Sequence, residues 1–147
     1  MKGKRFNIRV YGICEFQDAY LVTDEIVKGI RMTKFVGGGL EWGEGIRDAL
    51  IREFQEECGA LITETSHFYT TEHFQESAFC ADDQLISIYY KVNLDSPEQI
   101  NVVDTPFEGI SGGQQCFRWV GKTELCPADV TFPIDKLVVQ RLLKSFS

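Results

Sequence analysis

Three glutamates close together in the chain are the residues best suited to chemistry. They are Glu53, Glu56 and Glu57, and Arg52 directly precedes the first of them. The segment 45–58 contains no proline and no internal glycine, which predicts a helix. On a helix with about 3.6 residues per turn the three carboxylates share one stripe. Oxygen ligands on a rigid element are what a hard divalent cation such as Mg²⁺ requires.

The alternative is a solvent-exposed helix face on which Asp48 and Arg52 pair four residues apart. Two features weaken it. Like charges three or four residues apart repel by about 0.2–0.5 kcal/mol per pair, and we expect no cation to offset this repulsion. The stripe also borders the apolar positions Ile46 and Leu50 instead of opposing them. A metal-stabilised acidic module without catalysis remains a further alternative.

The spacing of chemical residues continues on the N-terminal side of the glutamates. Five residues separate Gly38 from Glu44, seven more lead to Arg52, and the segment from there reads REFQEECGA. This pattern resembles the Nudix box, G-x5-E-x7-R-E-U-x-E-E-x-G-U, where U is a bulky apolar residue. Ala60 is small for the last position, and Gly37 stands where many members have proline. Neither departure removes a polar group.

The resemblance implies a fold and a reaction. The fold is of the α/β class, an α/β/α sandwich with a mixed β-sheet, and we expect a single domain over residues 1–147. The reaction is attack of water on phosphorus in a nucleoside diphosphate linked to another moiety. A Nudix domain that senses a nucleotide ligand without catalysis is the alternative, although such regulators usually carry an additional DNA-binding domain and often lack box glutamates.

The resemblance also implies a metal site. Glu53, Glu56 and Glu57 would hold Mg²⁺ or Mn²⁺, together with a backbone carbonyl of Gly37 or Gly38. A cation there neutralises the diphosphate and acidifies a bound water.

Catalytic roles follow from the same resemblance. Arg52 would orient Glu53, and Glu44 would support the site near the helix start. We take Glu53 as the general base, because the adjacent guanidinium keeps it ionised. Glu57 or an acid in a later loop is the alternative base in this family, and Glu98 is a candidate for such a late carboxylate.

Substrate contacts are less well defined by the sequence. Trp42 lies within the box and is placed to contact the ligand or cap the site, and Arg9 and Arg31 could meet phosphate. About sixteen residues past the box, some ADP-ribose hydrolases of the family have proline and some dinucleoside-polyphosphate hydrolases have tyrosine. Residues 74–77 offer neither, which favours a nucleoside triphosphate.

The elements that must position these residues follow from hydrophobic periodicity. Alternating apolar residues predict strands, and spacing by three or four predicts helices. Gln17 and Asp18 mark a turn between the first two strands, and residues 93–115 form a long loop. The predicted strands cover 6–14, 19–23, 34–36, 61–74, 84–92 and 116–120, and the predicted helices cover 45–58 and the segment from Pro133 to the C-terminus.

Composition restricts the class of protein. The chain has 147 residues, with 15 basic and 22 acidic ones and a net charge of −7. This charge argues against nucleic acid or anionic lipid as the partner. The resemblance to the Nudix family implies a nucleotide-like small molecule as the substrate. No stretch reaches the ~18 apolar residues of a membrane span, and the five cysteines show no C-x-x-C pair. We expect a cytoplasmic protein with reduced thiols, and a homodimer is left open.

Overall fold

The central strand is the N-terminal segment in which apolar residues alternate with polar ones. The computed structural model describes residues 3–144, and in it β1 spans Arg5–Phe16. Its partner on one side is β6 (Asp83–Leu94), which runs parallel to it in register from Arg5 with Asp83 to Cys14 with Val92. β5 (Ile62–Thr70) pairs antiparallel with β6. The mixture of parallel and antiparallel pairs confirms the predicted mixed sheet.

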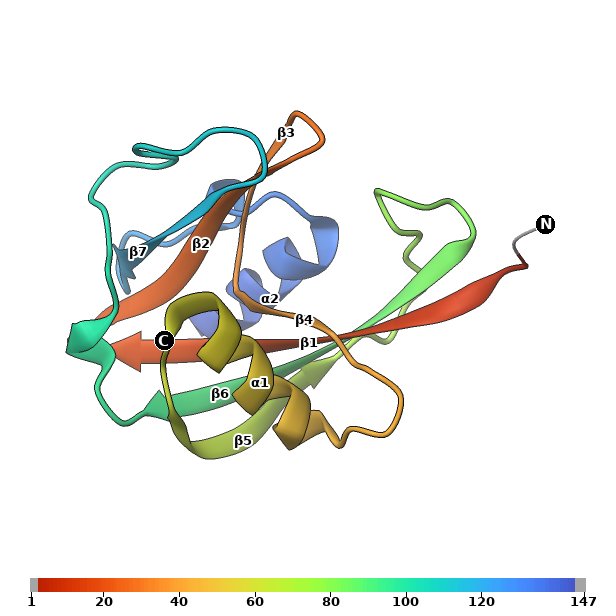
Figure 1. Cartoon of the computed structure of the whole chain (residues 1–147), viewed down its shortest axis with the longest axis horizontal. Helices are drawn as coiled ribbons and strands as arrows, with labels where there is room; N and C mark the ends of the chain where they lie inside the picture. The colour runs from red at the N-terminus through yellow and green to blue at the C-terminus, as the bar shows by residue number, and fades with distance from the viewer. Residues whose placement is uncertain (1–2, 145–147) are drawn as a thin grey trace.

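A second group of strands leaves the far end of β1. β2 (Ala19–Val27) pairs with β1 only at the turn, where Gln17 and Asp18 both have positive φ. β3 (Ile30–Lys34) and β7 (Gln115–Gly121) then flank β2 in antiparallel pairs. All seven strands belong to one sheet, whose two parts diverge beyond the turn (Figure 1).

Two predicted strands are wrong in their boundaries. The strand predicted over 61–74 ends at Thr70, and the one predicted over 34–36 is not a single strand. Residues 34–36 are the junction of two strands, since Phe35 separates β3 from β4 (Val36–Gly39). The glycines therefore lie within a strand, paired with Arg9–Tyr11 of β1. The prediction failed because glycine has low strand propensity, and the pairing with β1 supplies what the local sequence lacks.

Each face of the sheet is covered by one helix (Figure 1). α1 (Ile46–Cys58) buries Ala49, Leu50 and Phe54 against one face. α2 (Pro133–Lys144) covers the other face, with buried apolar residues that include Val138 and Leu142. The two apolar clusters give the three layers of the predicted α/β/α sandwich. Neither helix among residues 3–144 is long and apolar enough to cross a membrane.

A glycine lies at each end of α1 and defines where the helix begins and ends. Gly45 precedes the first turn, and its N–H donates to Oδ2 of Asp48 at 3.2 Å. Gly59 ends the helix in the left-handed conformation with φ 64°, and its N–H donates to the carbonyls of the last turn. The predicted helix over 45–58 is thus confirmed, with both glycines acting as its caps.

Candidate active site

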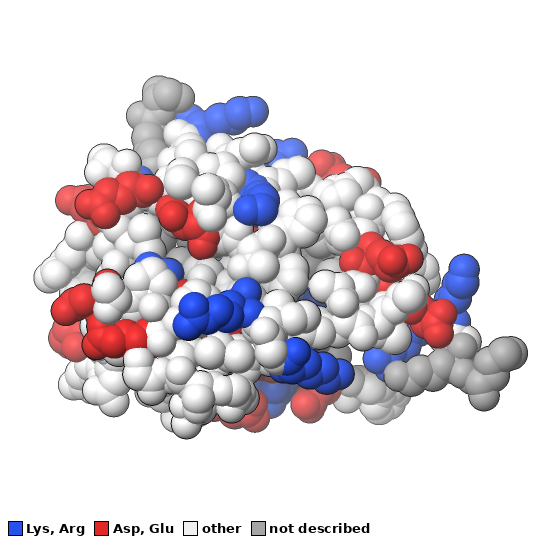
Figure 2. All heavy atoms as spheres, turned by 90° about the horizontal axis from the view of Figure 1, so that it is seen from above, with Lys and Arg blue, Asp and Glu red and all other residues white. Residues whose placement is uncertain are grey.

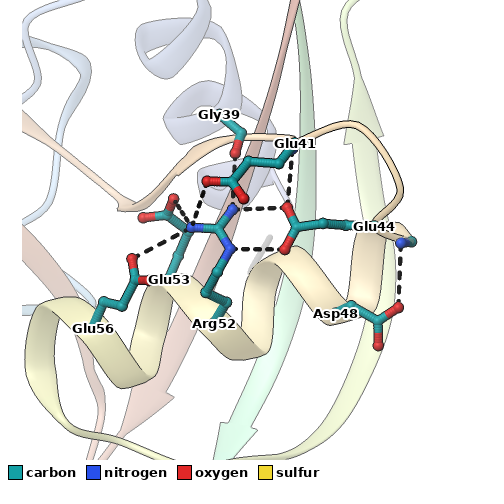
Figure 3. Close-up of polar contacts among 8 residues, drawn as sticks. Gly39, Glu41, Glu44, Asp48, Arg52, Glu53 and Glu56 are labelled. Carbon is teal, nitrogen blue, oxygen red and sulfur yellow. Dashed lines mark hydrogen bonds and ion pairs between the residues drawn. The ribbon is translucent and has the colours of Figure 1, made fainter.

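Arg52 is the centre of a dense group of charged side chains on α1 (Figure 3). Its guanidinium binds both carboxylate oxygens of Glu44, from Nε at 2.7 Å and from Nη2 at 2.8 Å. Nη2 also donates to the carbonyl of Gly39 at 3.1 Å, and Nη1 donates to Glu53 at 2.9 Å. A two-point contact with a carboxylate fixes the plane of a guanidinium, so Glu44 sets the orientation of Arg52.

Two expectations about this group were wrong. Asp48 does not pair with Arg52, because it accepts from the Gly45 N–H at the helix start. The glutamates also have a cation to offset their repulsion, since Nη1 of Arg52 contacts Glu53 and, at 3.4 Å, Glu56. The arginine beside Glu44 in turn lowers the pKa of that carboxyl to about 2. Sequence spacing identified the residues but not the direction in which Arg52 turns.

Glu53 and Glu57 lie deeper than Glu56. Only 14% of the Glu53 side chain is exposed, against 59% for Glu56. A Cβ on Gly38 would come within 2.5 Å of Oε1 of Glu53. Gly38 therefore leaves the space in which this carboxylate rests against β4, and any larger residue would displace it.

Glu57 is the residue whose environment is least satisfied. Its Oε2 is buried and has no hydrogen-bond partner among the described residues. Burial raises the pKa of Glu57 to about 8, with further contributions from the charge of Glu53 and a hydrogen bond shared with it, while Lys34 acts in the opposite direction. A buried acceptor without a donor is costly, and a proton or a cation between the two carboxylates would remove that cost.

The donor set suits a hard divalent cation, although the side chains are not yet arranged around one. Within residues 3–144, no three His, Cys, Asp or Glu side chains converge closely enough to hold an ion. The reason is visible in Figure 3, where Arg52 draws Glu53 and Glu56 toward itself. Carboxylate oxygens, one of them buried without a partner, match the preference of Mg²⁺ for oxygen ligands.

A cavity of about 370 Å³ opens beside β1 on the side of the sheet covered by α2. Arg9 and Tyr11 from β1 line it, and Nε of Arg9 donates to the Tyr11 hydroxyl at 3.1 Å. Tyr11 stacks on Tyr89, which also lines the cavity, with ring centroids 5.2 Å apart. The electrostatic contacts of Arg9 extend to Glu53 and Glu57. None of the described residues that line the cavity belongs to α1. Nη1 of Arg9 nevertheless lies near Gly39 of β4, next to the Gly38 against which Glu53 rests.

Three buried charged residues that line this cavity were missed by the sequence analysis. Asp83 accepts from Nε of Arg5 at 2.7 Å. Asp135 accepts from the Tyr89 hydroxyl at 2.6 Å, and burial raises its pKa to about 6. Lys34 lies 3.1 Å from Glu25 through its Nζ and is 8% exposed. The only available signal was a charged residue at a position within an otherwise apolar pattern, which the sequence alone does not distinguish from a solvated one.

The comparisons with known proteins decide the family. The NUDIX domain model matches residues 3–142. The chain belongs to the Nudix family. Hydrolysis of pyrophosphate bonds is the activity of the family. No curated protein sequence matches the chain.

Solved structures with the same fold include several Nudix proteins. One, from a study of MutT of Aliivibrio salmonicida and Vibrio cholerae, has 23% identity and a TM-score of 0.67 and covers 97% of this chain and 100% of its own. The Escherichia coli ORF135 protein has 18% identity and a TM-score of 0.72, with coverage of 98% and 93%. MutT from Bacillus halodurans has 17% identity and a TM-score of 0.67, with coverage of 93% and 82%. At these identities the likeness concerns the fold.

The remaining candidate residues of this Nudix domain lie apart from the carboxylates. Trp42 is fully exposed in the loop before α1, so it covers no part of the site in this structure. Arg31 stacks over Phe107 at 4.6 Å from the ring centre. Glu98 lies exposed in a short 3-10 turn (Pro97–Gln99) that follows β6. Of the residues proposed for substrate, Arg9 is the one that lines the cavity.

Proposed function

We propose that this Nudix domain is a Mg²⁺-dependent pyrophosphohydrolase, with Mn²⁺ as an alternative ion, that acts on a nucleoside diphosphate linked to another moiety. A nucleoside triphosphate is the favoured substrate. The observation that carries the proposal is the buried, unpartnered Oε2 of Glu57 beside Glu53, whose carboxylate rests in the space left by Gly38. Such an arrangement destabilises the folded protein, and a cation bound between the two carboxylates would remove that cost.

The box residues would divide the work as follows. Glu53, Glu56, Glu57 and the carbonyl of Gly38 would hold the ion, which neutralises the diphosphate and acidifies water when bound. Glu53 accepts the proton of the attacking water as the new bond to phosphorus forms and the bridging oxygen leaves.

Arg52 and Glu44 act through Glu53. The two hydrogen bonds from Glu44 hold the guanidinium in one plane, and Nη1 then fixes one oxygen of Glu53 at 2.9 Å. This contact directs the other oxygen of Glu53 away from Arg52. We therefore regard Arg52 and Glu44 as positioning residues.

The cavity beside β1 would hold the moiety attached to the phosphates. Its volume of about 370 Å³ lies within the usual range of ligand pockets. Its stacked tyrosines suit a planar ring. Arg9 connects this cavity to the glutamates, and Trp42 could close over a bound ligand from its exposed loop.

A nucleotide panel tests the proposal directly. The purified protein is incubated with Mg²⁺ and nucleoside triphosphates, nucleotide sugars, ADP-ribose or dinucleoside polyphosphates, and released phosphate, pyrophosphate and nucleoside monophosphate are measured. We expect turnover of at least one triphosphate that EDTA abolishes. Tight binding of nucleotides without product in any arm would favour the ligand-sensing alternative.

A further inference from the structure

Among the described residues, four cationic side chains line the cavity: Arg5, Arg9, Lys28 and Lys34. Arg5 is paired with Asp83, and the reaction as proposed leaves the buried Lys34 without a role. Lys34 ends β3 and is buried, yet its pKa is raised: burial acts to lower it, and nearby Tyr11 and Glu25 outweigh that effect. Lys34 thus remains an ammonium ion inside the protein. Arg9 is near enough to oppose its charge, so the two cations face the same space.

Lys34 interacts electrostatically with both parts of the site, the glutamates of α1 and the cavity beside β1. It contributes to the electrostatics of Glu57 on α1 and of Asp135 on α2. Lys34 and Arg9 both line the cavity, and Arg9 lies near Gly39 at the part of β4 where Glu53 rests against Gly38. The part of a nucleotide that lies between its nucleoside and the bond to be cleaved is a phosphate.

The bonding of the two cations leaves donors for such a group. An ammonium has three N–H donors and a guanidinium has five. The Nζ of Lys34 contacts Glu25 at 3.1 Å, and Nε of Arg9 donates to the hydroxyl of Tyr11. Nη1 of Arg9 lies near Gly39, at the edge of β4.

The charge around these two cations differs from that of the molecule as a whole. On the face seen in Figure 2, lysine and arginine side chains lie singly among uncharged and acidic ones. With a net charge of −7 the chain as a whole repels anions. Two adjacent cations inside a cavity are therefore a local exception to the charge of the molecule.

We propose that Lys34 and Arg9 together bind the phosphate that joins the group held in the cavity to the diphosphate bond that is cleaved. This proposal rests on the proposed function and makes it more specific. The protein would recognise a nucleoside monophosphate as a unit, and this unit would remain on the cavity side when the bond breaks. Lys34 is then a residue that determines specificity for the substrate.

Binding without metal or turnover tests the proposal. The probes are the four ribonucleoside 5′-monophosphates and the matching nucleosides, titrated calorimetrically in EDTA at one pH and ionic strength. Charge-assisted bonds to phosphate are about twice as strong as neutral ones, so we expect at least one monophosphate to bind about tenfold or more tightly than its nucleoside. Equal affinity for both members of every pair would overturn the proposal.

Variants then assign the preference to the two cations. Lys34→Met and Arg9→Met should each reduce the ratio of the two affinities toward one and change nucleoside binding by less than about twofold. Lys34→Arg should retain most of the preference. Lys91→Met, which removes an exposed lysine of β6, should retain all of it.

The variants also separate this proposal from the hydrolase proposal. If Lys34→Met does not fold, Arg9→Met decides, and an unchanged ratio in either folded variant overturns the proposal even if the enzyme hydrolyses triphosphates. An absence of hydrolysis with an intact, lysine-dependent preference would instead overturn the proposed function and support the phosphate site.

Discussion

The acidic stripe of α1 and the cavity beside β1 differ in how the sequence encodes them. The stripe and Glu44 lie within a stretch of fourteen residues on one helix and the loop before it. The cavity takes Arg9, Lys34, Tyr89 and Asp135 from four separate elements. A local group keeps its spacing through helix geometry alone, whereas a dispersed group exists only after the strands have paired. The local group can therefore be identified from a sequence pattern. The residues of the dispersed group can change without altering any recognisable pattern.

The largest expected effect concerns the local group. Glu53→Gln keeps the size of the side chain but removes the charge that binds a cation and accepts a proton. We expect kcat to fall by about 10²-fold or more, with the substrate found in the panel. Glu64→Gln, at an exposed position of β5, should be without effect. Full activity of the Glu53 variant would show that the base lies elsewhere.

A smaller loss is expected when Arg52 is changed but its charge is retained. Arg52→Lys cannot make the two parallel bonds to Glu44, so Glu53 loses its fixed orientation. We expect kcat to fall about tenfold while KM changes little. Arg47→Lys on the exposed side of the same helix is the matched control. A change in KM alone would mean that Arg52 contacts substrate instead of positioning Glu53.

Replacing Glu57 should increase the stability of the metal-free protein, whereas the two substitutions above reduce activity. Its folded-state pKa of about 8 lies above the ordinary 4.5, so ionisation destabilises the fold progressively as the pH rises from about 4.5 to 8. Glu57→Gln should therefore raise the Tm of the metal-free protein at pH 7.5 by several degrees.

The same variant should lose much of the stabilisation by Mg²⁺. A Mg²⁺ concentration tenfold above Kd adds about 1.4 kcal/mol to the free energy of unfolding of the wild type. Thermal melts with EDTA and with millimolar Mg²⁺ measure both effects. An equal response of the two proteins to Mg²⁺ would remove Glu57 from the metal site.

Asp135 gives the corresponding test for the dispersed group. Its pKa is raised from 3.8 to about 6, so the cost of ionisation is absent below about pH 4 and complete above about pH 6. Asp135→Asn should gain a few degrees in Tm relative to wild type as the pH rises through this window. The gain in Tm is limited because asparagine loses the favourable interaction of the carboxylate with the charges of Lys34 and Arg9. Asp104→Asn, at an exposed loop position, should show no such pH-dependent difference.

Much of the fold could be predicted because its signals are local. The helix over 45–58 follows from the absence of glycine and proline and from the glycine that ends it. The alternation of Ile86, Ile88 and Tyr90 similarly marks β6. The alternation of apolar residues does not determine which strands pair. The parallel pairing of β1 with β6 and the pairing of β7 with β2 therefore could not be predicted.

The site was predictable to the same extent. Box spacing located the carboxylates, but the raised pKa of Glu57 depends on its burial and on the charges of Lys34 and Glu25, which reach it only through tertiary structure. Lys34 itself appears in the sequence as an ordinary lysine between Thr33 and Phe35. Its burial results from pairing with Thr23 of β2 and proximity to Glu25.

The passage from β3 to β4 sets a fixed length between the two parts of the site. Lys34 and Gly38 are four residues apart in extended chain, which corresponds to about 13 Å at ~3.3 Å per residue. Because side chains alternate sides along a strand, one inserted or deleted residue here would reverse the facing of every position beyond it. We expect this segment to tolerate substitutions of side chains far better than any change in length.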